Sequence, residues 1–285
     1  IGPKNRRTRF DVSAVSGLTS FIGRERELEL LIDGFKRAKD GRGQAFSIVS
    51  EAGVGKSTLL YEFRKAIASD DVTFLEGKCL SYSQGVPYHL HIDTLKANFD
   101  IRDDDRETTI RKKVRKGLSI LNVDEDATLP FFLELLSVKV SELDLTAISP
   151  EIKKDRILNA LKRIVLKGSE IRPLVLAYED LHWIDSSSFD YLKYLLEIIP
   201  GARILLIFTY RPDFKNNFGA KSYHSQIVLN RLSNRESLTM VHQMLGAFAL
   251  DSKLEEYILK KTDGVPFFIE ELIKSFRETK IIEEI

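Results

Sequence analysis

Short apolar runs alternate with amphipathic stretches over most of the chain. Residues 45–50, 72–75, 174–178, 204–209 and 227–229 are largely apolar, which is typical of buried strands. Stretches with helical spacing separate these runs. Because near-continuous apolar strands alternate with helices, the pattern predicts an α/β fold whose parallel sheet is covered on both faces.

Two segments depart from this alternation. Residues 82–171 are too many for one crossover and hold several helical patterns, so they predict a helical insertion. After Leu229 the strand signals end, and Ser233 is a residue type that caps helices before three further helical stretches. We therefore predict a sheet domain over residues 1–232 and a small all-helical domain over 233–285.

Composition and charge narrow the class of protein. The 285 residues are 43% hydrophobic and 30% charged, which is typical of a soluble globular protein. A net charge of +1 gives no global field toward nucleic acid or an anionic membrane, and no apolar run approaches the ~18–20 residues that cross a bilayer. The single cysteine, Cys79, cannot form an intrachain disulfide and favours a cytoplasmic location. The first residue is Ile rather than Met, which suggests a piece of a longer protein.

A phosphate-binding loop is predicted between the first strand and the first long helix, in the sequence SEAGVGKS. Gly53 and Gly55 would let backbone N–H groups turn toward phosphate oxygens, Lys56 would reach the β and γ phosphates, and the Ser57 hydroxyl would ligate Mg²⁺. Ser50 stands where the strict pattern has its first glycine, which a negative φ would tolerate. The alternative is a chance Gly-Lys-Ser turn at a helix start. The predicted nucleotide-binding residues of this segment are Gly53, Val54, Gly55, Lys56, Ser57 and Thr58.

Two later strand ends supply the other expected groups. Glu179 and Asp180 follow the apolar run at 174–178, on the sheet edge where the phosphate loop lies, and could hold Mg²⁺ and polarise a water. Arg211 leaves the run at 204–209 on the same edge, where it could sense a γ-phosphate. Taken alone, Glu179 and Asp180 could simply be a polar turn after a strand, and Arg211 could simply be a surface residue. The predicted catalytic residues are Lys56, Glu179, Asp180 and Arg211, and the predicted metal ligands are Ser57 and Glu179.

Several short motifs follow one another along the chain. Besides the phosphate loop they are GLTSFIGRE at 17–25, GVPY at 85–88, EDLHWID at 179–185, TYRP at 209–212, LNRL at 229–232 and TDGVPF at 262–267. With these motifs the sequence resembles the STAND class of AAA+-related P-loop ATPases. The resemblance is strongest to the ATPase module of bacterial adenylate/guanylate cyclase-linked proteins, and it covers nearly the whole chain.

The resemblance implies a five-stranded parallel P-loop NTPase sheet with a helical insertion, followed by a helical lid. It places the strand of the phosphate loop beside the strand that precedes Arg211. It also implies that Phe21, Ile22, Gly23 and Arg24 lie by the adenine, and that Pro266 carries the lid's contact to the nucleotide. Asp180 stands where many AAA+ ATPases have the longer Glu, so the expected turnover is slow.

In function, the resemblance implies a switch that binds ATP or ADP with Mg²⁺ and hydrolyses ATP slowly, as part of a larger bacterial signalling protein. The expected partners are flanking cyclase and helical-repeat domains, with self-association, and neither a membrane nor nucleic acid. No cyclase domain lies in this segment. Two alternatives remain: a scaffold that holds ADP without turnover, and the ATPase module of a LuxR-type regulator or another DNA-acting AAA+ protein.

Overall fold

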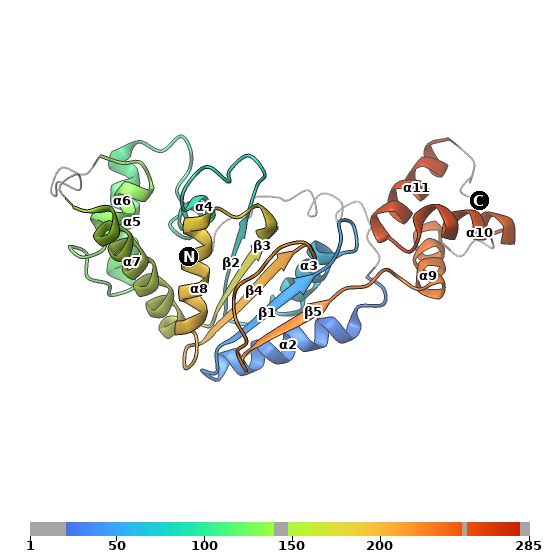
Figure 1. The fold of residues 1–285 in the computed structure, drawn as a ribbon, viewed down its shortest axis with the longest axis horizontal. Helices are drawn as coiled ribbons and strands as arrows, with labels where there is room; N and C mark the ends of the chain where they lie inside the picture. The colour runs from blue at the N-terminus through green and yellow to red at the C-terminus, as the bar shows by residue number, and fades with distance from the viewer. Residues whose placement is uncertain (1–20, 140–147, 247–249, 280–285) are drawn as a thin grey trace.

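The computed structural model describes residues 21–139, 148–246 and 250–279, so the first four residues of the GLTSFIGRE motif lie outside the described part. Its centre is a five-stranded sheet in the order β2-β3-β4-β1-β5, with every neighbouring pair parallel (Figure 1). The strands are β1 (Gln44–Val49), β2 (Thr73–Lys78), β3 (Leu174–Glu179), β4 (Ile204–Tyr210) and β5 (His224–Val228). The parallel sheet is confirmed, and β1 lies beside β4 as expected.

The apolar patterns of the strands follow from their places in the sheet. The central strands β3 and β4 are buried almost throughout, so both alternating faces are apolar. Leu174 and Leu176 join one hydrophobic cluster, whereas Val175 and Ala177 join the cluster on the opposite face. The edge strand β5 starts three residues before the predicted run, because its first residues His, Ser and Gln are polar and partly exposed.

Helices cover both faces of the sheet. On one face α2 (Glu25–Lys39) and α3 (Lys56–Ala66) pack against β1, β3 and β4 through shared apolar residues. On the other face lies α8 (Ser186–Ile198), preceded by the short 3₁₀ helix η2 (Leu181–Trp183). The site-bearing loops at the carboxyl ends of the strands are thus held by a core on each side.

Four helices lie between β2 and β3 in the described chain. They are α4 (His89–Asn98), α5 (Glu107–Ile120), α6 (Leu129–Leu135) and α7 (Pro150–Ile171). They gather beside the β2 edge of the sheet, at the end of the molecule away from the C-terminal helices (Figure 1). Phe132 and Leu133 are fully buried among them and belong to the cluster that continues into β3 and β4. The insertion therefore shares its core with one face of the sheet.

The C-terminal helices α9 (Asn234–Leu245), α10 (Ser252–Thr262) and α11 (Pro266–Glu278) pack around their own hydrophobic cluster beyond β5 (Figure 1). Ser233 caps α9 as predicted, in a reciprocal capping box with Glu236. Pro266 occupies the first turn of α11, where its missing N–H costs nothing. The division into domains at residue 232 stays a prediction. Among the described residues, no helix is long and apolar enough to cross a membrane.

Candidate functional site: a phosphate loop beside the C-terminal helices

The loop between β1 and α3 has the backbone that phosphate binding requires. Gly53 and Gly55 adopt positive φ values of 79° and 108°, and Gly55 is the N-cap of α3. The N-terminus of α3 therefore faces the loop with its free N–H groups and its partial positive charge. Ser50 is not among the described residues with positive φ, so a side chain costs nothing there and the missing glycine leaves no strain.

Lys56 folds back over this loop. Its ammonium donates hydrogen bonds to the backbone carbonyl of Ser50 at 2.7 Å and to that of Glu51 at 3.0 Å. The side chain is buried, and burial lowers its pKa, while the charge of Asp180 opposes that effect. A cation held by two neutral carbonyls would interact more favourably with a phosphate oxygen, so this arrangement suits Lys56 for anion binding.

Ser57 and Glu179 meet at the expected metal position. The Ser57 hydroxyl donates a hydrogen bond of 2.6 Å to Oε2 of Glu179, which ends β3. A hydroxyl and a carboxylate oxygen this close form a hard oxygen donor pair, and Mg²⁺ prefers such donors. The two residues predicted as metal ligands are therefore brought together across 122 positions of sequence.

Asp180 lies at the same edge in an unusual backbone conformation. Its φ is 57°, and its backbone N–H donates to the Thr209 hydroxyl at 3.1 Å. Its carboxylate forms an ion pair of 3.2 Å with Lys78, the last residue of β2. Burial would lower the pKa of Lys78, but the carboxylates of Glu179 and Asp180 outweigh burial and raise it. Lys78 was not among the predicted site residues, because nothing in the sequence around a lysine that ends an edge strand marks it as part of a site.

One cavity of ≈ 230 Å³ collects most of the predicted site. It is lined by Ala52, Gly53, Gly55, Lys56, Ser57, Thr58, Asp180, Arg211, Pro266, Phe267 and Glu270. Residues from three strand ends and from α11 therefore share one space. Val54 is buried in the core under the loop. Glu179 does not line the cavity, but it accepts a hydrogen bond from Ser57, which does.

Helix α11 contacts the phosphate loop directly. The backbone N–H of Phe267 donates to the carbonyl of Gly53 at 3.2 Å. A β-carbon built on Gly53 would lie 3.0 Å from Cβ of Phe267 and 3.1 Å from Cγ1 of Val265. A side chain at position 53 is thus disfavoured for two reasons, the positive φ and the close approach of α11.

The segment from Phe21 to Arg24 is not part of this cavity. Phe21 packs on the core shared by α2, α3 and the sheet, whereas Ile22 packs on the cluster of the C-terminal helices. The Arg24 guanidinium donates to the Asn230 carbonyl, and a β-carbon on Gly23 would meet Glu236 of α9. This segment therefore bridges the sheet and the C-terminal helices, and its predicted contact with adenine stays a prediction.

Two further polar groups were not recognised from sequence. Both ring nitrogens of His182 are buried and have no hydrogen-bond partner among the described residues, and burial lowers its pKa, with Asp180 and Arg211 among the charges acting on it. Glu270 faces the cavity from α11, and burial, followed by the neighbouring Glu271, raises its pKa to about 7. Only the fold shows that either residue lies near the phosphate loop.

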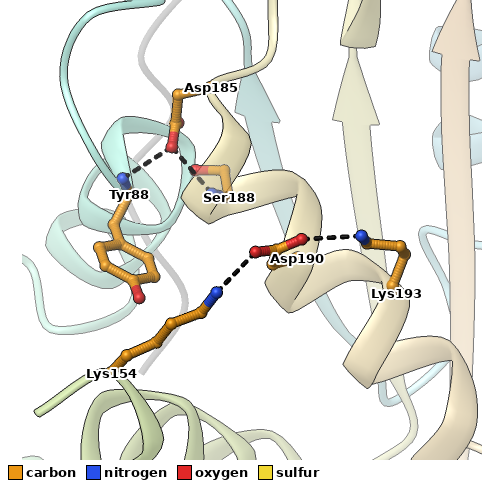
Figure 2. Close-up of polar contacts among 6 residues, drawn as sticks. All are labelled: Tyr88, Lys154, Asp185, Ser188, Asp190 and Lys193. Carbon is orange, nitrogen blue, oxygen red and sulfur yellow. Dashed lines mark hydrogen bonds and ion pairs between the residues drawn. The ribbon is translucent and has the colours of Figure 1, made fainter. Parts of the chain in front are cut away.

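Asp185 of the EDLHWID motif has a different place. Its Oδ1 accepts the backbone N–H of Ser188 at 2.8 Å as the N-cap of α8, and that of Tyr88 at 3.0 Å (Figure 2). Tyr88 has a φ of 60° and belongs to the GVPY motif. Asp185 therefore joins the start of α4 to the start of α8, and its engaged carboxylate is a poor candidate for a catalytic base.

Comparison with protein families gives two matches. A model described as "AAA ATPase domain" matches residues 20–207, and one described as "Domain of unknown function (DUF8739)" matches residues 233–284. An uncharacterised protein of Rhizobium meliloti (strain 1021) is 26% identical over 257 residues, which are 88% of this chain and 24% of that protein. The chain thus spans about a quarter of the length of this relative.

Solved structures also match this chain at low sequence identity. The Drosophila ORC bound to DNA has a TM-score of 0.51 at 12% identity, covering 92% of this chain and 58% of that one. RuvB of Thermotoga maritima has 0.47 at 14%, covering 92% and 64%, and a STAND protein with a tetratricopeptide repeat sensor from Pyrococcus horikoshii has 0.45 at 15%, covering 90% and 32%. The family match spans the phosphate loop and the acids after β3, which the structure brings to one edge of a five-stranded parallel sheet. The chain therefore belongs to the AAA ATPase domain family.

Proposed function

We propose that this chain is a nucleotide-dependent switch, in which ATP or ADP with Mg²⁺ binds at the phosphate loop and sets the position of the helical lid. The observation that carries the proposal is the shared cavity, whose wall combines Lys56 and Arg211 of the sheet domain with Pro266 of α11. A nucleotide there would contact both parts at once. It would shift an open–closed equilibrium by the difference in its affinity for the two states.

The residues have distinct proposed roles. Lys56 and the N–H groups of the loop bind the β and γ phosphates, and Arg211 contacts the γ-phosphate only. Ser57 and Glu179 hold Mg²⁺, which when bound neutralises charge on the phosphates. Asp180 orients the attacking water and accepts its proton, and Pro266 anchors the lid over the nucleotide.

The lid movement is tested by distances between spin labels on α2 and α10, measured without nucleotide, with ADP and with a non-hydrolysable ATP analogue. We expect the ATP analogue and ADP to give different distributions. Arg211→Ala should abolish that difference and keep ADP binding, because only the γ-phosphate contact is lost. Three coincident distributions would show a static binder and refute the switch.

A second candidate, a scaffold that holds ADP without turnover, is favoured by the ion pair between Asp180 and Lys78. The Lys78 ammonium occupies a carboxylate oxygen of Asp180 that would otherwise accept a hydrogen bond from the attacking water. The purified protein decides between the two: ADP released on denaturation, with no phosphate produced from added ATP, supports the scaffold. Phosphate release that depends on Asp180 supports the switch.

The larger context is also a proposal. We infer that the chain acts within a longer cytoplasmic signalling protein. The greater length is supported by the relative, of which the chain spans about a quarter. The sequence motifs favour flanking cyclase and helical-repeat domains, with self-association. The alternative of a DNA-acting ATPase predicts duplex binding by the full-length protein, which a mobility-shift titration would reveal. Sequencing the complete reading frame identifies the flanking domains.

A further inference from the structure

A second cavity, of ≈ 400 Å³, lies between the helical insertion and the sheet. Thr73 and Leu174, the first residues of β2 and β3, form part of its wall. The phosphate loop instead follows the carboxyl end of β1. Because all the strands are parallel, one cavity lies toward the amino ends of the strands and the other toward their carboxyl ends. This second space is therefore separate from the proposed nucleotide site.

The wall of this cavity is mainly apolar. The apolar residues that line it include Leu75, Phe99, Leu121, Ile164 and Val165. Ile120 of α5 and Ile171 of α7 also line it, yet they are 56% and 52% exposed. Its volume falls in the ~300–1,000 Å³ range of small-molecule sites, which are mostly apolar with a few polar groups. The cavity thus has the size and lining that an apolar ligand segment requires.

Gly168 of α7 lines the same cavity and has no packing reason to be glycine. A β-carbon built on Gly168 meets no atom within 4 Å, although glycine inside a helix costs about 0.5–1 kcal/mol relative to alanine. Gly117 of α5 shows the contrast, because its β-carbon would lie 2.2 Å from the Phe99 ring. Gly168 therefore widens the cavity at a cost to the helix that its protein contacts do not repay.

Three cations line the cavity, and two are engaged. The Lys113 ammonium pairs with Asp105 at 2.6 Å and donates to the Asp100 carbonyl at 2.5 Å. Arg172 pairs with Asp71 at 3.2 Å. Lys116 makes no ion pair or hydrogen bond with any residue that the structure describes. Asp100 is the acid in the lining, and the ion pairs with Asp105 and Asp71 neutralise Lys113 and Arg172. Among the described cations of the lining, Lys116 is therefore the one left to pair with an anionic group.

We propose that this cavity binds a small amphipathic carboxylate, with its unbranched apolar tail between α5 and α7 and its carboxylate at Lys116. The tail would cover the exposed parts of Ile120 and Ile171 and occupy the space beside Gly168. The carboxylate would form a charge-assisted contact with the Lys116 ammonium. This site goes beyond nucleotide binding and does not depend on it.

Decanoate, below its micelle concentration, is the probe, titrated calorimetrically into the whole chain alongside 1-decanol and decylammonium. We expect saturable binding at one site per chain, with decanoate tightest. Lys116→Gln should weaken decanoate about three- to tenfold and leave decanol unchanged, because only the charged contact is lost. The matched control, Lys112→Gln, removes a neighbouring exposed charge that does not line the cavity and should change nothing.

Gly168→Leu should abolish binding of both decanoate and decanol by filling the cavity. Leucine favours helices more than glycine does, so circular dichroism should show a retained fold. The proposal is overturned by an absence of saturable binding to the parent, by decylammonium binding as tightly as decanoate, or by a folded Gly168→Leu variant that binds decanoate normally. None of these readouts involves nucleotide, so failure here leaves the proposed switch unaffected.

Discussion

At the scale of single residues, the acids after β3 have separate environments although they are neighbours in sequence. Glu179 accepts the Ser57 hydroxyl, Asp180 pairs with Lys78, and Asp185 caps α8 while holding Tyr88. The proposed roles differ accordingly: metal binding for Glu179, orientation of water for Asp180 and structural support for Asp185. Substitutions of the three acids should therefore affect different measurements.

Asp180→Asn should leave nucleotide affinity within about twofold and lower the ATPase rate by ~10²-fold or more, because an amide cannot accept a proton from the attacking water. Phosphate release under single-turnover conditions measures the rate. Glu179→Gln is the matched comparison, and it should instead raise the Mg²⁺ concentration needed for half-maximal rate. Hydrolysis by Asp180→Asn at the parent rate would show that Asp180 is not the base.

Glu270 predicts a pH dependence of stability. Its folded pKa of about 7 lies above the ordinary 4.5, because burial and then Glu271 penalise the charged form. The folded state binds its proton more tightly, so this contribution to the free energy of unfolding is full below pH 4.5 and is lost as pH rises through 7. Glu270→Gln should flatten this part of the decline between pH 4.5 and about 8, measured by urea unfolding. A parent and variant with parallel pH profiles would place the titration elsewhere.

At the scale of elements, the junction between α4 and α8 depends on one carboxylate. Asp185 is buried and accepts hydrogen bonds from two backbone N–H groups (Figure 2). One belongs to Tyr88, 97 positions away in sequence, and the other to Ser188, 3 positions away. Asp190 of α8 also pairs with Lys154 of α7 at 2.6 Å and with Lys193 at 2.7 Å. The buried contact is the stronger of these, since exposed ion pairs contribute little.

Asp185→Ala should lower the free energy of unfolding by about 2 kcal/mol, from the loss of an N-cap and an unsatisfied buried N–H at Tyr88. Nucleotide affinity should remain, because Asp185 does not line the phosphate-loop cavity. Denaturant unfolding and a nucleotide titration measure the two effects. The control Lys154→Ala removes an exposed ion pair and should cost less than about 1 kcal/mol. Equal losses in the two variants would contradict this account of the junction.

Sequence reasoning recovered the elements whose signals are local. The buried strands β3 and β4 are continuous apolar runs, and the phosphate loop has its glycines, lysine and serine within a few residues. It missed the start of β5, whose exposed polar residues do not mark a strand. It also missed Lys78 and Glu270, because their places at the site arise from contacts between elements far apart in the chain.

At the scale of the whole molecule, the sheet domain and the C-terminal helices meet at the phosphate loop. The hydrogen bond from Phe267 to Gly53 places α11 on the loop, and Phe21 and Ile22 link the two hydrophobic clusters elsewhere. A ligand bound between these parts would report its presence through the lid. We therefore expect adenine nucleotide to bind at this loop.

Calorimetric titration of Mg-ATP and Mg-ADP into nucleotide-free protein measures this binding. The parent should bind both, and Lys56→Ala should bind about ten- to a hundredfold more weakly, because a charge-assisted contact with phosphate contributes ~1.5–3 kcal/mol. Lys65→Ala, an exposed change on the same helix, should bind like the parent. No binding by the folded parent, or equal affinities of the parent and Lys56→Ala, would contradict the account.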